Sequence, residues 1–204
     1  MSDALGLSAL PRLVTQPMAV FKALSESAPE GHRVFFQLIL PLSLIPPVLA
    51  YVGGSAFGWR LGGGEPLMMP AQSLTLISLA YFFAMVFGLV SSAAVSAWMA
   101  ATYGAQRAFG THLALAGLVA APVILASAAH LAPHVFINML VLIPALIWSL
   151  YLLYRGLPEA LAIPPERGML MATALAGYLL VAIVSLLGIT VALWSGGIGP
   201  AIGV

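Results

Sequence analysis

Two of the four histidines, His130 and His134, are spaced four residues apart, so two neutral imidazoles could share a metal ion. A zinc-like ion takes four ligands, and the candidates for the remaining positions are His112, Asn138 and Glu65. However, Pro133 separates the pair, and His112 is expected at the opposite side of a bilayer. The pair is therefore interpreted either as a metal site or as two residues that cap a helical hairpin in headgroup water. No cofactor is predicted.

A second group of candidate residues consists of charged side chains in residues 148–169, the segment WSLYLLYRGLPEALAIPPERGM. Its charged residues, drawn from only seven basic and six acidic residues in the chain, are Arg155, Glu159, Glu166 and Arg167. We expect a short charged loop between two apolar runs. These four side chains could bind a partner, or they could form a solvated loop that pairs its own charges and sets the orientation of the protein in a membrane.

The composition identifies the solvent in which these residues must be positioned. The 204 residues are 62% hydrophobic and 6% charged, and soluble domains contain roughly 25% charged residues. With a mean hydropathy of +1.08, the chain is predicted to be an integral, multi-pass membrane protein. A net charge of +1 gives no basic surface for nucleic acid, and the lack of cysteine excludes disulfides and thiolate chemistry.

The apolar runs predict an all-α fold with five transmembrane helices. A cytoplasmic segment, residues 1–33, precedes a membrane domain, residues 34–204, and the spans are expected at about 34–53, 74–101, 111–131, 134–154 and 169–194. Pro17 to Ala28 is predicted to form a short amphipathic helix at the membrane interface, with Met18, Phe21 and Leu24 on its apolar face.

The positive charges predict the orientation. If the N-terminus is cytoplasmic, six of the seven Lys and Arg residues fall in inner segments and only Arg60 falls in an outer one. Cytoplasmic segments are enriched in Lys and Arg. We therefore predict that the N-terminus is inside and the C-terminus outside.

Small residues recur every four positions along the second span: Ala84, Gly88, Ser92, Ser96 and Ala100. Such a stripe lets another helix approach closely. It is expected to pack against a span of the same chain, and a homo-oligomer formed through the face of Ala84, Gly88, Ser92 and Ser96 is the alternative.

The spans contain few polar groups that could carry chemistry. The two strongly polar intramembrane side chains, Gln37 and Asn138, are expected to face the bundle and to bond across helices. The predicted spans contain no Asp, Glu, Lys or Arg, which argues against a proton-coupled transporter. No histidine is expected near the serines of the second span, so an enzyme is not predicted. Prolines interrupt the first, third and fourth spans and could open a path for a neutral solute.

An aromatic span end, the sequence YRGLPEALAIPPERG and a last apolar run together resemble the Yip family of Rab-GTPase-interacting membrane proteins, in particular its bacterial inner-membrane branch. The residues that carry the resemblance are Tyr154, Gly156, Leu157, Pro158, Pro165 and Glu166, with weaker echoes at Pro17, Phe21 and Pro122. The resemblance implies five spans, a cytoplasmic N-terminal segment, location in a bacterial inner membrane and no catalytic activity. Eukaryotic relatives act in vesicle traffic with prenylated GTPases, but the N-terminal segment here is shorter than theirs.

The predicted function is therefore a non-enzymatic membrane-organising or adaptor protein. It would bind a protein or lipid partner at its cytoplasmic face, in addition to the surrounding bilayer. The alternative is a channel or carrier for a neutral solute, a lipid or a metal ion that passes through the proline-broken helices.

Overall fold

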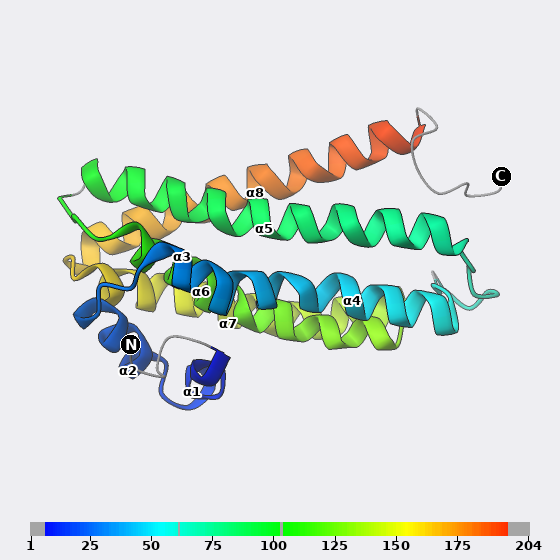
Figure 1. Ribbon diagram of the computed structural model, residues 1–204, viewed down its shortest axis with the longest axis horizontal. Coiled ribbons are helices and arrows are strands. Elements are labelled where there is room, and N and C mark those ends of the chain that lie inside the picture. Colours follow the sequence, from blue (N-terminus) through cyan, green and yellow to red (C-terminus); the bar gives the residue numbers. More distant parts are fainter. Residues whose placement is uncertain (1–6, 61, 103, 196–204) are drawn as a thin grey trace.

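The computed structural model describes residues 7–60, 62–102 and 104–195, and in this part of the chain the ordered elements are helical. Five helical segments are long and apolar enough to cross a membrane: Gly31–Phe57, Ala71–Thr102, Phe109–Leu131, Val135–Leu161 and Pro165–Ser195. Figure 1 shows these segments extended along one common long axis, with α1 (Leu10–Thr15) and α2 (Pro17–Glu26) beside one end of them. The predicted all-α fold with five candidate spans is confirmed.

The first and third segments each consist of more than one element. The first is α3 (Gly31–Val34), a π-helical turn η3 (Phe35–Ile39) and α4 (Leu40–Phe57), and the third is α6 (Phe109–Ala126) followed by the 3₁₀-helix η4 (Ser127–Leu131). The others are α5 (Ala71–Thr102), α7 (Val135–Leu161) and α8 (Pro165–Ser195). A further 3₁₀ turn, η2 (Leu7–Ala9), precedes α1.

Helix α6 lies at the centre of the bundle. It packs against α5 on one side, α7 on another, and α3 and α4 on a third. Its sequence, FGTHLALAGLVAAPVILA, is rich in Ala and Gly, which let neighbouring backbones come close. At Gly110, an added Cβ would overlap the carbonyl oxygen of Pro29, so the chain just before α3 rests directly on the α6 backbone.

The proline-containing helices are not broken. Helix α4 continues through Pro46 and Pro47, and α6 continues through Pro122. The π turn η3 lies just ahead of Pro41, where a wider turn makes room for a ring that would otherwise collide with the preceding turn. The prolines expected to interrupt the spans are therefore accommodated within continuous helices in the described part of the chain.

The charged segment after the fourth span differs from its prediction. Helix α7 runs through Pro158 to Leu161, so Arg155 and Glu159 are helical and only residues 162–164 form the connection to α8. The helix continues because Pro158 costs it one amide donor while Leu157, Ala160 and Leu161 are buried against the core. The charged residues of this segment are therefore exposed, but they do not indicate where the helix ends.

A Schellman motif ends α7. The amide of Ala162 donates to the carbonyl of Glu159, and the amide of Ile163 donates to the carbonyl of Pro158 at 3.1 Å. The motif requires a left-handed residue, and Ala162 fills that position with φ of 51°. Glycine would adopt this conformation without the steric cost of a Cβ.

The substitution Ala162→Gly is therefore expected to stabilise the protein by about 1 kcal/mol, because it removes the left-handed penalty at C′. The measurement is the midpoint of thermal unfolding in detergent micelles. Gly104→Ala is the converse control, since Gly104 also has a positive φ, of 77°, and alanine there should lower the midpoint. A lower midpoint for Ala162→Gly would contradict this account of the turn.

The small-residue stripe of α5 is divided between two environments. Ser92, Ser96 and Ala100 are buried in the chain's own core, as expected for internal packing. A Cβ added at Gly88 would meet no atom within 4 Å, so this part of the stripe faces open space. A homo-oligomer along the stripe stays a prediction, and Ala84 and Gly88 are the positions left for it.

The last helix leaves the bundle as it proceeds. Gly168, Met171, Ala172 and Leu175 of α8 are buried, whereas every residue from 183 to 195 is exposed. Figure 1 shows the second half of α8 diverging from α4 and α7, which lie below α5 in this view. The tightly packed part of the molecule is therefore the end that carries α2, the start of α6 and the connection between α7 and α8.

Candidate functional site

Helix α2 is fastened to the last turns of α7. Its side chains Val20, Phe21 and Leu24 are fully or almost fully buried, which confirms that Phe21 and Leu24 belong to one apolar face. The ring of Phe21 lies directly over Gly156, where an added Cβ would overlap three ring atoms. The apolar face that was expected to rest on the bilayer thus packs against protein.

Arg107 joins the ends of these two helices. Its Nε donates to the carbonyl of Leu161, the last residue of α7, at 3.3 Å, and one terminal nitrogen donates to the carbonyl of Ser25 in α2 at 3.0 Å. The last carbonyls of a helix lack partners within it, and a cation there also interacts favourably with the helix dipole. One guanidinium therefore holds α2 and α7 with their C-terminal ends at the same level.

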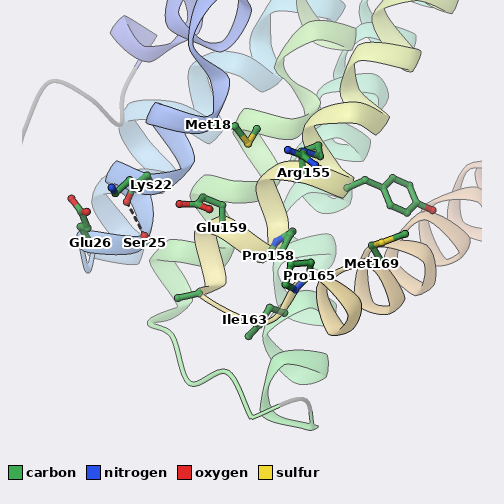
Figure 2. A pocket seen from close by; sticks show the side chains of 12 residues that line it. Met18, Lys22, Ser25, Glu26, Arg155, Pro158, Glu159, Ile163, Pro165 and Met169 are labelled. Carbon is green, nitrogen blue, oxygen red and sulfur yellow. Dashed lines mark hydrogen bonds between the residues drawn. The ribbon is translucent and has the colours of Figure 1, made fainter.

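A cleft of about 720 Å³ lies between α2, the end of α7 and the start of α8. Figure 2 shows the side chains of α2 along one side and those of α7 and α8 along the other. The lining residues are Met18, Lys22, Ser25, Glu26, Tyr154, Arg155, Pro158, Glu159, Ala162, Ile163, Pro165 and Met169. The volume is within the usual range for small-molecule sites, roughly 300–1,000 Å³.

Four charged side chains line this cleft: Lys22 and Glu26 from α2, and Arg155 and Glu159 from α7. The side-chain ion pairs within 4 Å in the described part of the chain are those of Glu30 with His32 and Arg33, so the cleft charges are not neutralised by one another at that distance. All four are exposed. The cleft combines an apolar floor with charges of both signs that are available to a ligand.

The sequence predicted half of this charge set. Arg155 and Glu159 were candidates and do line the cleft, whereas Glu166 and Arg167 are exposed on the first turn of α8 and are not among its lining residues. Lys22 and Glu26 of α2 complete the set and were not among the predicted partner-binding residues. No local pattern could have joined them to α7, because the contact is made across more than half of the chain.

The comparison with known proteins agrees with this architecture. The Yip1 domain matches residues 12–187, a stretch that contains α2, the cleft and all but the last turns of α8. The chain belongs to the Yip1 family.

Two relatives of this chain are inner membrane proteins of a bacterium. The chain is 30% identical over 159 residues to inner membrane protein YohC of Escherichia coli strain K12, covering 78% of this chain and 82% of the relative. The same values hold for YohC of strain CFT073 of that species. No solved structure matches. With the five apolar helices, this likeness confirms a multi-pass protein of the bacterial inner membrane.

In this Yip1 family member, His130 and His134 lie at the other end of the bundle from the cleft, and each makes a hydrogen bond. His130 Nδ1 lies 2.5 Å from Asn138 Oδ1. His134 Nδ1 accepts a hydrogen bond from the backbone amide of Phe136 at the start of α7. The Asn138 side chain donates to the carbonyls of Ala129, Ala132 and His134. Asn138 thus faces the bundle as expected, and no group of three His, Cys, Asp or Glu ligands occurs among the described residues.

The structure contradicts two expectations for this Yip1 chain. Gln37 does not face the bundle, because the π turn η3 places it on the exposed side while Leu38 and Ile39 are buried. His112 is indeed far from His130 along α6, but its Nδ1 lies 2.9 Å from the hydroxyl of Ser96, where no histidine was expected. Both residues are buried, and they meet because α5 and α6 form a hairpin.

Replacing Ser96 by Ala is expected to destabilise the protein by about 0.5–1.5 kcal/mol, because it leaves His112 without its hydroxyl partner. The measurement is the midpoint of thermal unfolding in detergent. Ser91→Ala is the matched control, since the Ser91 hydroxyl bonds only to the carbonyl of Gly88 in its own helix. An equal midpoint for the two variants would show that the bond between α5 and α6 adds no stability.

Proposed function

We propose that the chain is a non-enzymatic membrane protein that organises the membrane or acts as an adaptor by binding a protein or lipid partner in the cleft between α2, α7 and α8. The observation that supports this proposal is the cleft, which combines apolar and charged lining residues. Its four charged side chains, all among the described residues, form no ion pair with one another: Lys22, Glu26, Arg155 and Glu159. Such a surface has charges for specificity and apolar area for affinity.

The proposal includes an orientation with the N-terminus in the cytoplasm and the C-terminus outside. It is supported by the location of the basic residues, since the elements at the cleft end of the bundle carry Arg12, Lys22, Arg33, Arg107, Arg155 and Arg167. Arg60 follows α4 at the other end. An excess of Lys and Arg is typical of cytoplasmic segments. In this orientation α2 lies at the inner interface, and Lys22 and Glu26 line the cleft that it forms with α7.

A non-enzymatic role is supported by the surroundings of the buried Ser96–His112 pair. Ser96 and His112 line a cavity of about 60 Å³, and its other lining residues are apolar apart from Ser92. This volume is well below the roughly 300–1,000 Å³ that is usual for small-molecule sites. The carrier alternative gains no comparable support, because the described helices continue through their prolines and do not open around them.

The test compares the double variant Arg155→Ala/Glu159→Ala with the native chain in its own membrane. We expect the variant to fold, because both side chains are exposed, and to lose at least about tenfold of the partner that co-purifies with the native chain. Equal recovery of every co-purifying protein and lipid would overturn the proposal.

Glu65→Ala is the matched control. Glu65 lies between α4 and α5, at the other end of the bundle. The substitution therefore removes one acidic side chain that does not line the cleft. It should retain the partner at the native level. Loss of the partner in this control as well would indicate a general effect of charge removal and would count against the cleft.

A further inference from the structure

The charges of the cleft are sorted by height along the two helices. Phe21 of α2 packs on Gly156 of α7, and Arg107 binds the carbonyls of Ser25 and Leu161. Along α2 the contact at Phe21 comes before that at Ser25, and along α7 the contact at Gly156 comes before that at Leu161. The two helices therefore run in the same direction there. Both proceed from the membrane toward the connection between α7 and α8.

With this register, each helix presents its cation before its anion. Arg155 directly precedes the contact residue Gly156, and Lys22 directly follows Phe21. Glu159 and Glu26 each lie one helical turn, roughly 6 Å, beyond the cation of the same helix. The cleft therefore has a positive level nearer the membrane and a negative level farther out. Figure 2 shows Glu159 of α7 nearer than Arg155 to the end at which Ile163 lies.

The apolar part of the cleft lies on its membrane side. Met18 and Tyr154 precede the charged residues on their helices, and Met169 follows the first turn of α8. Exposed apolar side chains continue from there along the spans, including Leu150 and Tyr151 of α7 and Leu170 of α8. A ligand with long hydrocarbon chains could thus enter from the bilayer with its polar group in the cleft.

On the basis of the proposed function, we propose that the ligand of this cleft is a zwitterionic aminophospholipid, of which phosphatidylethanolamine is the simplest. In this lipid the phosphate lies next to the glycerol and acyl chains, and a two-carbon linker places the primary ammonium farther out. The phosphate meets Arg155 and Lys22, and the ammonium meets Glu159 and Glu26. A phosphate accepts charge-assisted hydrogen bonds from basic side chains, and an ammonium donates them to carboxylates.

Lipids of other headgroup chemistry match this order less well. Phosphatidylglycerol offers the phosphate but leaves both carboxylates without a cation. Phosphatidylcholine has the cation but no N–H to donate to a carboxylate. A buried or partly enclosed charge that loses water without gaining a partner is unfavourable, so the negative level provides the selectivity and the positive level provides affinity for any phospholipid.

The test is native mass spectrometry of the full chain in detergent micelles, to which phosphatidylethanolamine, phosphatidylglycerol or phosphatidylcholine is added at equal concentration. We expect one tightly retained phosphatidylethanolamine, held about tenfold more strongly than either other lipid, since hydrogen bonds to charged groups contribute enough for such a ratio. Equal retention of the three lipids by the native chain would overturn the inference.

Variants separate the two levels of charge. The double variant Glu26→Gln/Glu159→Gln is expected to lower retention of phosphatidylethanolamine about tenfold, to the level of phosphatidylglycerol. Lys22→Gln/Arg155→Gln is expected to weaken retention of both lipids, and Glu65→Gln, outside the cleft, should match the native chain. An unchanged lipid preference in Glu26→Gln/Glu159→Gln would also overturn the inference.

Failure of this inference is distinguishable from failure of the proposed function. If the lipids are retained equally but a protein partner is lost from Arg155→Ala/Glu159→Ala, the cleft is an adaptor site and the lipid assignment is wrong. If neither a lipid nor a protein depends on these side chains, both proposals are wrong.

Discussion

Gly156→Ala is expected to detach α2 from the membrane helices while leaving the five long helices in place. The added methyl group would overlap the ring of Phe21, which is fully buried and cannot turn aside. Overpacking of this kind costs about 1–3 kcal/mol of stability. Here the cost destabilises the packing of one short helix, α2, against α7. Hydrogen exchange of the amides of α2 and limited proteolysis near Ser27 are the measurements, and both should become faster in the variant.

A double-mutant cycle shows whether the effect arises at this contact. Phe21→Ala removes the ring, so Gly156→Ala should cost much less in a Phe21→Ala background than in the native chain. Gly177→Ala is the control for alanine in a helix, because a Cβ there meets no atom within 4 Å. Additive effects of Phe21→Ala and Gly156→Ala would contradict the packing described here.

Gly53→Ala is expected to have the largest effect at the opposite end of the bundle. A Cβ on Gly53 of α4 would overlap the carbonyl oxygen of His130 in η4. A backbone atom cannot rotate away as a side chain can, so α4 and η4 must separate, at a cost of about 2–3 kcal/mol or more. The separation would also disturb the hydrogen bond between His130 and Asn138. The measurement is the midpoint of thermal unfolding in detergent.

Gly88→Ala provides the comparison for this prediction. Gly88 lies within α5 with open space around it, so alanine should be neutral or stabilise the helix by about 0.5–1 kcal/mol. Opposite signs for the two substitutions are the expected result. A Gly53→Ala protein as stable as the native chain would show that α4 and η4 are not in the close contact described here.

The sequence predicted the features that depend on local composition. Runs of apolar residues are long enough to identify five candidate spanning helices. The three-residue spacing of Met18, Phe21 and Leu24 predicted an apolar face on α2, but it was expected to rest on the bilayer and not on α7. The end of α7 was misjudged, because Arg155 and Glu159 indicate exposure and exposed residues can be helical. Gln37 was expected to face the bundle because it is polar, but the π turn leaves it exposed while Leu38 and Ile39 are buried.

The parts of the site that could not be predicted depend on contacts between distant segments. Lys22 and Glu26 reach the same cleft as Arg155 only because Phe21 packs on Gly156. Likewise, Ser96 meets His112 because the α5–α6 connection places both near the same end of a hairpin. Neither pairing leaves a periodic signal, since each depends on how whole helices are arranged.

The bonds of Arg107 to Ser25 and Leu161 have a consequence for biosynthesis. Helix α2 leaves the ribosome early, but Gly156, on which Phe21 rests, is made about 135 residues later. Until the fourth span has been inserted, Phe21 lacks its contact with Gly156 and Arg107 lacks the carbonyl of Leu161. The complete cleft therefore cannot form until α7 has been made, and a shorter chain leaves the face of Phe21 without Gly156 to cover it.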